Sequence, residues 1–258
     1  MANPVLSERT FENFTEPGYG AGPPATGAVA PAAMTLVGTA RKALILLALV
    51  VAGAAFTWTK ILEPGGAQLA MGLMWGGVIG GLLLSLVISF KPTTAPYLAP
   101  VYGVLEGLAL GAISAVMNER YPGIVTQAVA LTFAVAAIMF LLFQSGIIKV
   151  TQKFMMGVIA ATGAIALVYL VNLGLMAFGQ TAMAKFLWSS SPLSIGVSVV
   201  VTIVAALNLV LDFDLIEKGV RARAPKFMEW YGAFGLTVTL VWLYLEILRL
   251  LAKLNSRD

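Results

Sequence analysis

The sequence predicts an all-α polytopic membrane protein with seven transmembrane helices. Hydrophobic residues make up 59% of the 258 residues and charged residues only 11%, which lies far outside the composition of soluble globular proteins. The apolar residues gather in runs of about 20, the length that a helix needs to cross the hydrocarbon core of a bilayer. Charged residues, Pro and Gly separate these runs. The chain therefore has no room for a separate soluble domain.

The first 34 residues differ in composition from the rest of the chain. They are rich in Gly, Pro and Ala, carry charges of both signs and show no periodicity, which is typical of disorder. A signal peptide would place its charges directly before a short apolar core, whereas the first apolar run here follows Arg41 and Lys42 and is long enough to stay in the membrane. We expect a disordered cytosolic tail over residues 1–34 and a seven-helix transmembrane domain over residues 35–258.

Each expected span ends at a break that a membrane helix would not contain. The spans are 43–59, 68–90, 97–117, 124–146, 154–178, 193–216 and 230–252. The breaks after the first six are TKILEPGG, FKPTTAP, NERYPG, KVTQK, QTAMAKFLWSSSP and EKGVRARAPKFMEW. These signals fix the number and the order of the spans.

Basic residues predict the orientation in the membrane. The side of the N-terminus carries most of the Lys and Arg residues, namely Arg9, Arg41, Lys42, Lys91, Lys149, Lys153, Lys218, Arg221, Arg223 and Lys226. The positive-inside rule therefore places the N-terminus in the cytosol. Seven spans would put the C-terminus outside, but the basic residues Arg249, Lys253 and Arg257 at that end disagree. A seventh helix that re-enters the membrane, or that sits deep in the bundle, stays an open alternative.

Small residues indicate which helix faces pack closely. The second span contains two overlapping GxxxG pairs, and the third repeats glycine every four residues; the glycines are Gly76, Gly77, Gly80, Gly81, Gly103, Gly107 and Gly111. Such spacing allows close helix approach in lipid. We expect this packing within one molecule, which favours a monomer over a dimer.

Two acids are expected deep in the membrane, where an ionised group is costly and is usually retained for function. Glu106 lies roughly 14 Å along the third span, and Asp212 lies roughly 7 Å from the cytosolic end of the sixth. Asn208 is one turn before Asp212 on the same side of that helix. Two carboxylates in a low dielectric can share a proton, and can hold a divalent cation transiently when both ionise. The alternatives are a protonated Glu106 bonded to a backbone carbonyl and an Asp212 that snorkels to the interface.

Two further acids are expected to form local pairs. Asp214 points away from Asp212 and can pair with Lys218 four residues later. Glu246 lies near the outer end of the seventh span, with Arg249 three residues later, and is expected to form a structural pair.

The missing residue types exclude several classes of function. The chain has no Cys and no His, so it forms no disulfide and no thiolate or imidazole metal site. An intramembrane serine protease needs His or Lys beside its Ser, and a retinal protein needs a membrane-embedded Lys; the expected spans contain neither. An aspartyl intramembrane protease needs Asp on two helices with Gly before one of them, whereas Asp212 and Asp214 share a helix and point apart. We therefore expect no enzymatic activity, no bound cofactor and no nucleic-acid partner.

Several segments resemble the Bax inhibitor/YccA family, also called the transmembrane Bax inhibitor motif family. LVLDFDLIEKG resembles its sixth helix, VYGVLEGLALGAIS its third and LTVTLVWLYLEILRLL its seventh. NPVLSERTF and AAFTWTK are similar to a bacterial branch, which implies the bacterial inner membrane. The resemblance covers roughly residues 35 to 254, and it implies six helices packed around a central seventh.

The resemblance also implies a pH-sensitive calcium leak. In that family an acid on the sixth helix and another on the seventh form a pH-sensing pair. The alignment carries the first onto Asp212 and the second onto about Thr239, which is no acid. Either the pair is lost and the leak with it, or Glu106 supplies the second carboxylate from the third helix; we expect the latter. The family also pairs the helix-six acid with a basic residue from the end of the second helix, for which Lys91 is the nearest match.

Two functions are therefore expected in competition. The first is a leak for cations, with calcium or protons as cargo, gated by protonation of Asp212 and Glu106. The alternative is a regulator that carries nothing and binds a membrane-anchored AAA protease or another membrane protein through its N-terminal tail, as some relatives are described to do.

Overall fold

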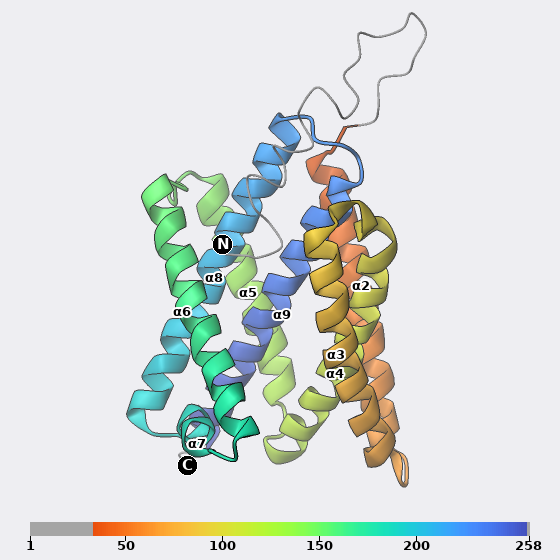
Figure 1. Cartoon of the computed structure of the whole chain (residues 1–258), viewed down its shortest axis with the longest axis vertical. Coiled ribbons are helices and arrows are strands. Elements are labelled where there is room, and N and C mark those ends of the chain that lie inside the picture. The colour runs from red at the N-terminus through yellow and green to blue at the C-terminus, as the bar shows by residue number, and fades with distance from the viewer. Residues whose placement is uncertain (1–32, 257–258) are drawn as a thin grey trace, which may run out of the picture. The chain divides into compact units, whose positions relative to one another are not determined.

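The computed structural model describes residues 33–256, which contain helices and no strand. Seven of the helices are long and apolar enough to cross a membrane, which confirms the predicted fold class and number of spans. The predicted tail, residues 1–34, lies outside the described residues except for its last two. The long helices (Figure 1) are α2 (Leu36–Leu62), α3 (Gly66–Phe90), α4 (Ala95–Arg120), α5 (Ile124–Gln144), α6 (Gln152–Ala177), α8 (Pro192–Arg221) and α9 (Met228–Asn255).

Several helices are longer than hydropathy alone predicts, because they continue through charged residues. Helix α2 begins at Leu36, and its N-cap Thr35 accepts a hydrogen bond from the Gly38 amide at 3.0 Å. Its first two turns therefore include Arg41 and Lys42, which the prediction placed before the span. Helix α9 likewise continues to Asn255 and includes Lys253.

The break predicted between the fifth and sixth spans contains a short helix, α7 (Ala182–Trp188). Leu187 is buried, whereas Phe186 and Trp188 are exposed. Exposed aromatic side chains beside the end of a span are typical of the membrane interface.

The chain divides into two compact units, which are described separately. One combines residues 33–116 with 212–237, and the other combines residues 117–211 with 238–256. Helices α8 and α9 each contribute one part to each unit.

In the first unit, glycines let α2 and α3 approach α4 closely, as predicted. A Cβ atom at Gly107 would collide with the backbone of Val50 on α2, and one at Gly111 would collide with Ala54. A Cβ at Gly77 of α3 would likewise meet the backbone of α4. These glycines therefore pack within the molecule. Gly76, from the other GxxxG pair, faces open space.

The helices differ strongly in burial. Of the most apolar window of α9, 61% is buried, the largest share among the seven spans, whereas the corresponding share in α6 is 6%. Such burial is what the predicted central position of the seventh helix requires. Helix α6 instead leaves nearly its whole apolar surface for lipid.

Candidate functional site

Asp212 is fully buried, with 0% of its surface exposed. It lies on α8, whose 30 residues span about 45 Å and exceed a hydrocarbon core of about 30 Å by about 15 Å. With that excess shared equally between the two ends, Asp212 lies about 6 Å inside the hydrocarbon, close to the depth predicted from the sequence. A buried acid at this depth is costly, and such acids usually serve a function.

Glu106 is half-buried on α4 and accepts a hydrogen bond from the hydroxyl of Tyr102, one turn earlier. Tyr102 is itself fixed, because its ring packs edge-on against Phe234 with 4.8 Å between the centroids. Gly81 of α3 leaves room for the carboxylate, since a Cβ there would lie 2.9 Å from Glu106 Oε2. The Glu106 carboxylate therefore lies against α3, where a side chain at residue 81 would otherwise be.

Glu106 and Asp212 both lie in the half of the membrane that is nearer the side of the N-terminus. Helix α4 has 26 residues, so Glu106 lies about 12 Å inside the hydrocarbon by the same estimate. In a chain of successive spans, the start of the third and the end of the sixth lie on one side of the membrane. The depths of the two carboxyls thus differ by about one helical turn, and their pairing stays a prediction.

Asn208, one turn before Asp212 on α8, is buried, with 1% of its surface exposed. Its Nδ2 donates to Thr162 Oγ1 and to the carbonyl oxygen of Val204, both at 2.8 Å. Its Oδ1 is buried and accepts no hydrogen bond from residues 33–256. An unsatisfied buried amide oxygen is uncommon, and it leaves one acceptor available inside the protein.

The other predicted residues are placed as follows. Asp214 pairs with Lys218 at 3.0 Å, which confirms the local pair. Thr239 is buried on α9, with 3% exposed. Lys91 is exposed at the end of α3 and forms no ion pair within the described part of the chain. Its predicted role as the basic residue that pairs with Asp212 therefore stays a prediction.

A buried carboxylate that the sequence analysis missed lies in the first turn of α9. The side chain of Glu229 is 0% exposed and forms ion pairs with Lys42 and Lys226. Its Oε1 accepts hydrogen bonds from the amide and the hydroxyl of Thr35, at 2.9 and 2.8 Å, and from Lys226 Nζ at 2.7 Å. We call Thr35, Lys42, Lys226 and Glu229 the Glu229 cluster. It joins the start of α2 to the start of α9.

Glu229 was missed because its most important partners are distant in the sequence. The segment that contains it has the composition of a polar loop, and only Lys226 is a neighbour along the chain. Thr35 lies 194 residues away. No local pattern reports a contact at that separation.

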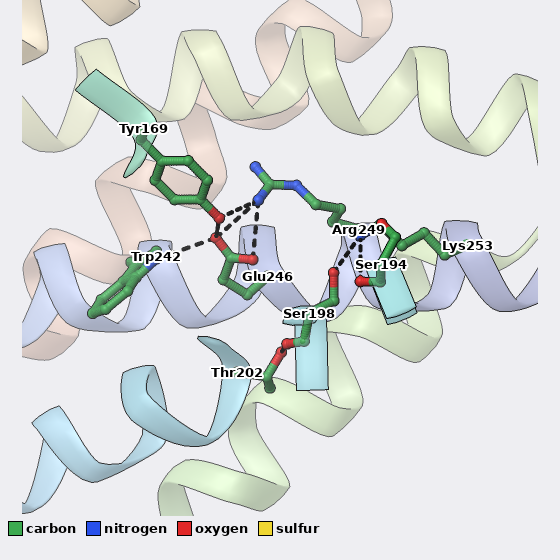
Figure 2. Close-up of polar contacts among 8 residues, drawn as sticks. All are labelled: Tyr169, Ser194, Ser198, Thr202, Trp242, Glu246, Arg249 and Lys253. Carbon is green, nitrogen blue, oxygen red and sulfur yellow. Dashed lines mark hydrogen bonds and ion pairs between the residues drawn. The ribbon is translucent and has the colours of Figure 1, made fainter. Parts of the chain in front are cut away.

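The second unit contains another polar network, which Figure 2 shows. Glu246 Oε1 accepts hydrogen bonds from the Tyr169 hydroxyl at 2.9 Å and from Trp242 Nε1 at 3.3 Å. Arg249 Nη1 lies 3.1 Å from Glu246 Oε2, which confirms the predicted structural pair, and it also donates to the Tyr169 hydroxyl. Arg249 therefore neutralises the charge of Glu246, and Tyr169 and Trp242 donate hydrogen bonds to it.

Lys253, one turn after Arg249 on α9, corrects one premise of the sequence analysis. It lies inside the helix and is 3% exposed. Its Nζ donates to the carbonyl oxygen of Ser194 at 3.0 Å, to Ser194 Oγ at 2.8 Å and to Ser198 Oγ at 2.6 Å. The premise that no Lys lies inside a span is therefore wrong. The exclusion of an intramembrane serine protease, which rested on that premise, therefore stays a prediction.

No group of three or more Asp, Glu, His or Cys side chains that could hold a metal ion occurs within residues 33–256. Calcium prefers six to eight oxygen ligands. Contact with a passing calcium ion would therefore depend on Asp212 and Glu106 together with oxygens that are not carboxylates.

Comparison with known families gives one match. A family model described as Bax inhibitor 1 like matches residues 3–256. No curated protein matches the chain.

Proposed function

Because this chain belongs to the Bax inhibitor 1 like family, we propose that it is a proton-sensitive cation leak of the membrane, with calcium as the expected cargo. The observation that carries this proposal is the burial of Asp212 inside a transmembrane helix, at 0% exposure. A carboxyl kept out of water at that depth changes the local field by a full charge whenever it gains or loses a proton.

In the proposed mechanism Asp212 senses protons and Glu106 is the second carboxyl. Ionised Asp212 attracts a cation into the low dielectric, and protonation removes that attraction. Glu106 is held by Tyr102, and its carboxylate fills the space that Gly81 leaves. Asp212 and Glu106 replace the helix-six and helix-seven pair that the family resemblance implies, because the Thr239 hydroxyl does not ionise at physiological pH.

We place the protein in the inner membrane of a bacterium with its N-terminus in the cytosol, since the basic residues favour that side. We further propose that it works as a monomer without enzymatic activity or a bound cofactor.

Calcium flux into dye-loaded proteoliposomes tests this function. We expect flux that differs between about pH 6 and about pH 8, because protonation of Asp212 removes the charge that attracts the cation. Asp212→Asn should abolish that difference. Asp214→Asn is the matched control, since it makes the same chemical change two residues away at a side chain that is paired with Lys218. Equal behaviour of the two variants would contradict the proposal.

The alternative is a regulator that binds a membrane protease through the N-terminal tail. One observation favours it: the end of the tail is attached to the loop between α8 and α9. The Met34 amide donates a hydrogen bond to the Ala224 carbonyl oxygen at 2.7 Å, and Ala33 forms an isolated antiparallel β-bridge with Pro225. Deletion of residues 2–33 separates the two functions. Flux should survive the deletion in a leak, whereas regulation of a protease should not.

A further inference from the structure

The network around Arg249 carries an uncompensated positive charge. Arg249 and Lys253 lie one turn apart on α9, where like charges repel. Glu246 is the one carboxylate that pairs with this network in the described part of the chain. Two cations against one anion leave a net charge of about +1 beside a membrane, where charge without a partner is costly.

Arg249 has hydrogen-bonding capacity that the protein does not use. Within residues 33–256 its hydrogen bonds all come from Nη1, and its Nε is buried without an acceptor. Figure 2 shows the other terminal nitrogen pointing away from Glu246. A guanidinium has five donors arranged to bind planar or tetrahedral anions with two hydrogen bonds at once.

Two aromatic rings hold the guanidinium in place. Arg249 Cζ lies 5.3 Å from the centroid of the Tyr169 ring and 5.2 Å from that of the Trp188 ring, within the range of cation–π attraction. Trp188 comes from the short helix α7 and is 56% exposed. Arg249 is itself partly exposed, at 21% of its side chain, so an anion can reach it from outside.

The depth of Arg249 identifies the source of the anion. Helix α9 has 28 residues and is about 42 Å long, so it exceeds a hydrocarbon core of about 30 Å by about 6 Å at each end. Arg249 lies six residues before the last residue, Asn255, and therefore about 3 Å inside the hydrocarbon. From there a long side chain reaches the level of the lipid phosphates. Exposed Trp188 and Phe186 are typical of that interface.

We propose that Tyr169, Trp188, Glu246, Arg249 and Lys253, named here the lipid site, bind the phosphate of an anionic lipid headgroup. Arg249 donates directly to the phosphate oxygens from the terminal nitrogen that points away from Glu246 (Figure 2). Lys253 adds attraction through its buried charge, and the two rings keep the guanidinium at the right depth. The negative charge of the lipid phosphate thereby neutralises the net positive charge that remains after Glu246 pairs with Arg249.

Native mass spectrometry of the detergent-solubilised protein with dioleoyl-phosphatidylglycerol tests this site. Arg249→Gln should weaken lipid binding roughly tenfold, the effect of losing one charge-assisted contact. Glu246→Gln should strengthen it, because the site then carries one more net positive charge while Gln still accepts from Tyr169. Arg120→Gln is the matched control: Arg120 also ends a span and faces the ring of Tyr121, but it is exposed and forms no ion pair within residues 33–256.

The test is decisive because Arg249→Gln and Glu246→Gln are expected to change lipid affinity in opposite directions. Should Arg249→Gln fail to fold, Glu246→Gln and Arg120→Gln still decide it. Equal lipid binding by wild type and Glu246→Gln would overturn the proposal, as would equal losses in Arg249→Gln and Arg120→Gln. Displacement of the lipid by a millimolar excess of inorganic phosphate or glycerol phosphate would assign the site to a soluble phosphate and overturn the lipid assignment.

Discussion

Replacement of Glu229 by Gln should destabilise the protein strongly. The carboxylate is fully buried, and it neutralises both Lys42 and Lys226. Gln keeps an oxygen for the two hydrogen bonds from Thr35, but it loses the charge and turns an NH2 group toward one of the lysines. Removing one partner of a buried ion pair costs about 3 to 5 kcal/mol. Because Lys226 is half-exposed and regains water, we expect the lower end, about 3 kcal/mol.

A loss of that size should lower the midpoint of thermal unfolding by roughly 6 to 12 °C. The measurement is tryptophan fluorescence in detergent during heating, and Trp230 reports locally, since Lys42 lies 5.6 Å from its ring centroid. Glu217→Gln is the matched control, because Glu217 pairs with an Arg221 that is 73% exposed and such pairs contribute at most about 1 kcal/mol. If both variants unfold at the same temperature, the structural role assigned to the Glu229 cluster is wrong.

Three other substitutions have defined outcomes. Gly107→Ala should reduce the yield of folded protein on size-exclusion chromatography, because its Cβ collides with α2, whereas Gly163→Ala on α6 faces open space and should be tolerated. Tyr169→Phe removes a hydroxyl that serves both Glu246 and Arg249 and should cost about 1 to 2 kcal/mol in thermal unfolding; an unchanged midpoint would contradict that network. Asp214→Asn should change the unfolding free energy by less than about 1 kcal/mol, because both members of its pair keep contact with water.

The features that the sequence predicts correctly depend on residues close to one another in the chain. Seven spans follow from apolar runs, because the bilayer acts on every run independently of the others. The pairs Asp214 with Lys218 and Glu246 with Arg249 follow from helical spacing, because three and four residues correspond to one turn. The glycines of α4 show their packing role for the same reason.

Features that depend on distant contacts could not be predicted in this way. Hydropathy placed Lys42 and Lys253 outside the spans, because it scores each residue without its partners. In the structure Glu229 compensates Lys42, and Ser194 and Ser198 satisfy Lys253. The Glu229 cluster and the lipid site are both built from segments far apart in the chain.

The most direct test of the proposed function is calcium flux in proteoliposomes across about pH 5.5 to about pH 8.5, because protonation of Asp212 or Glu106 should change the flux. It compares wild type with Asp212→Asn, Glu106→Gln and Asp214→Asn. The account predicts a pH-dependent step in wild type and Asp214→Asn that either of the other substitutions flattens. A step that survives in both Asp212→Asn and Glu106→Gln, or folded wild-type protein that passes no calcium at any pH, would contradict it.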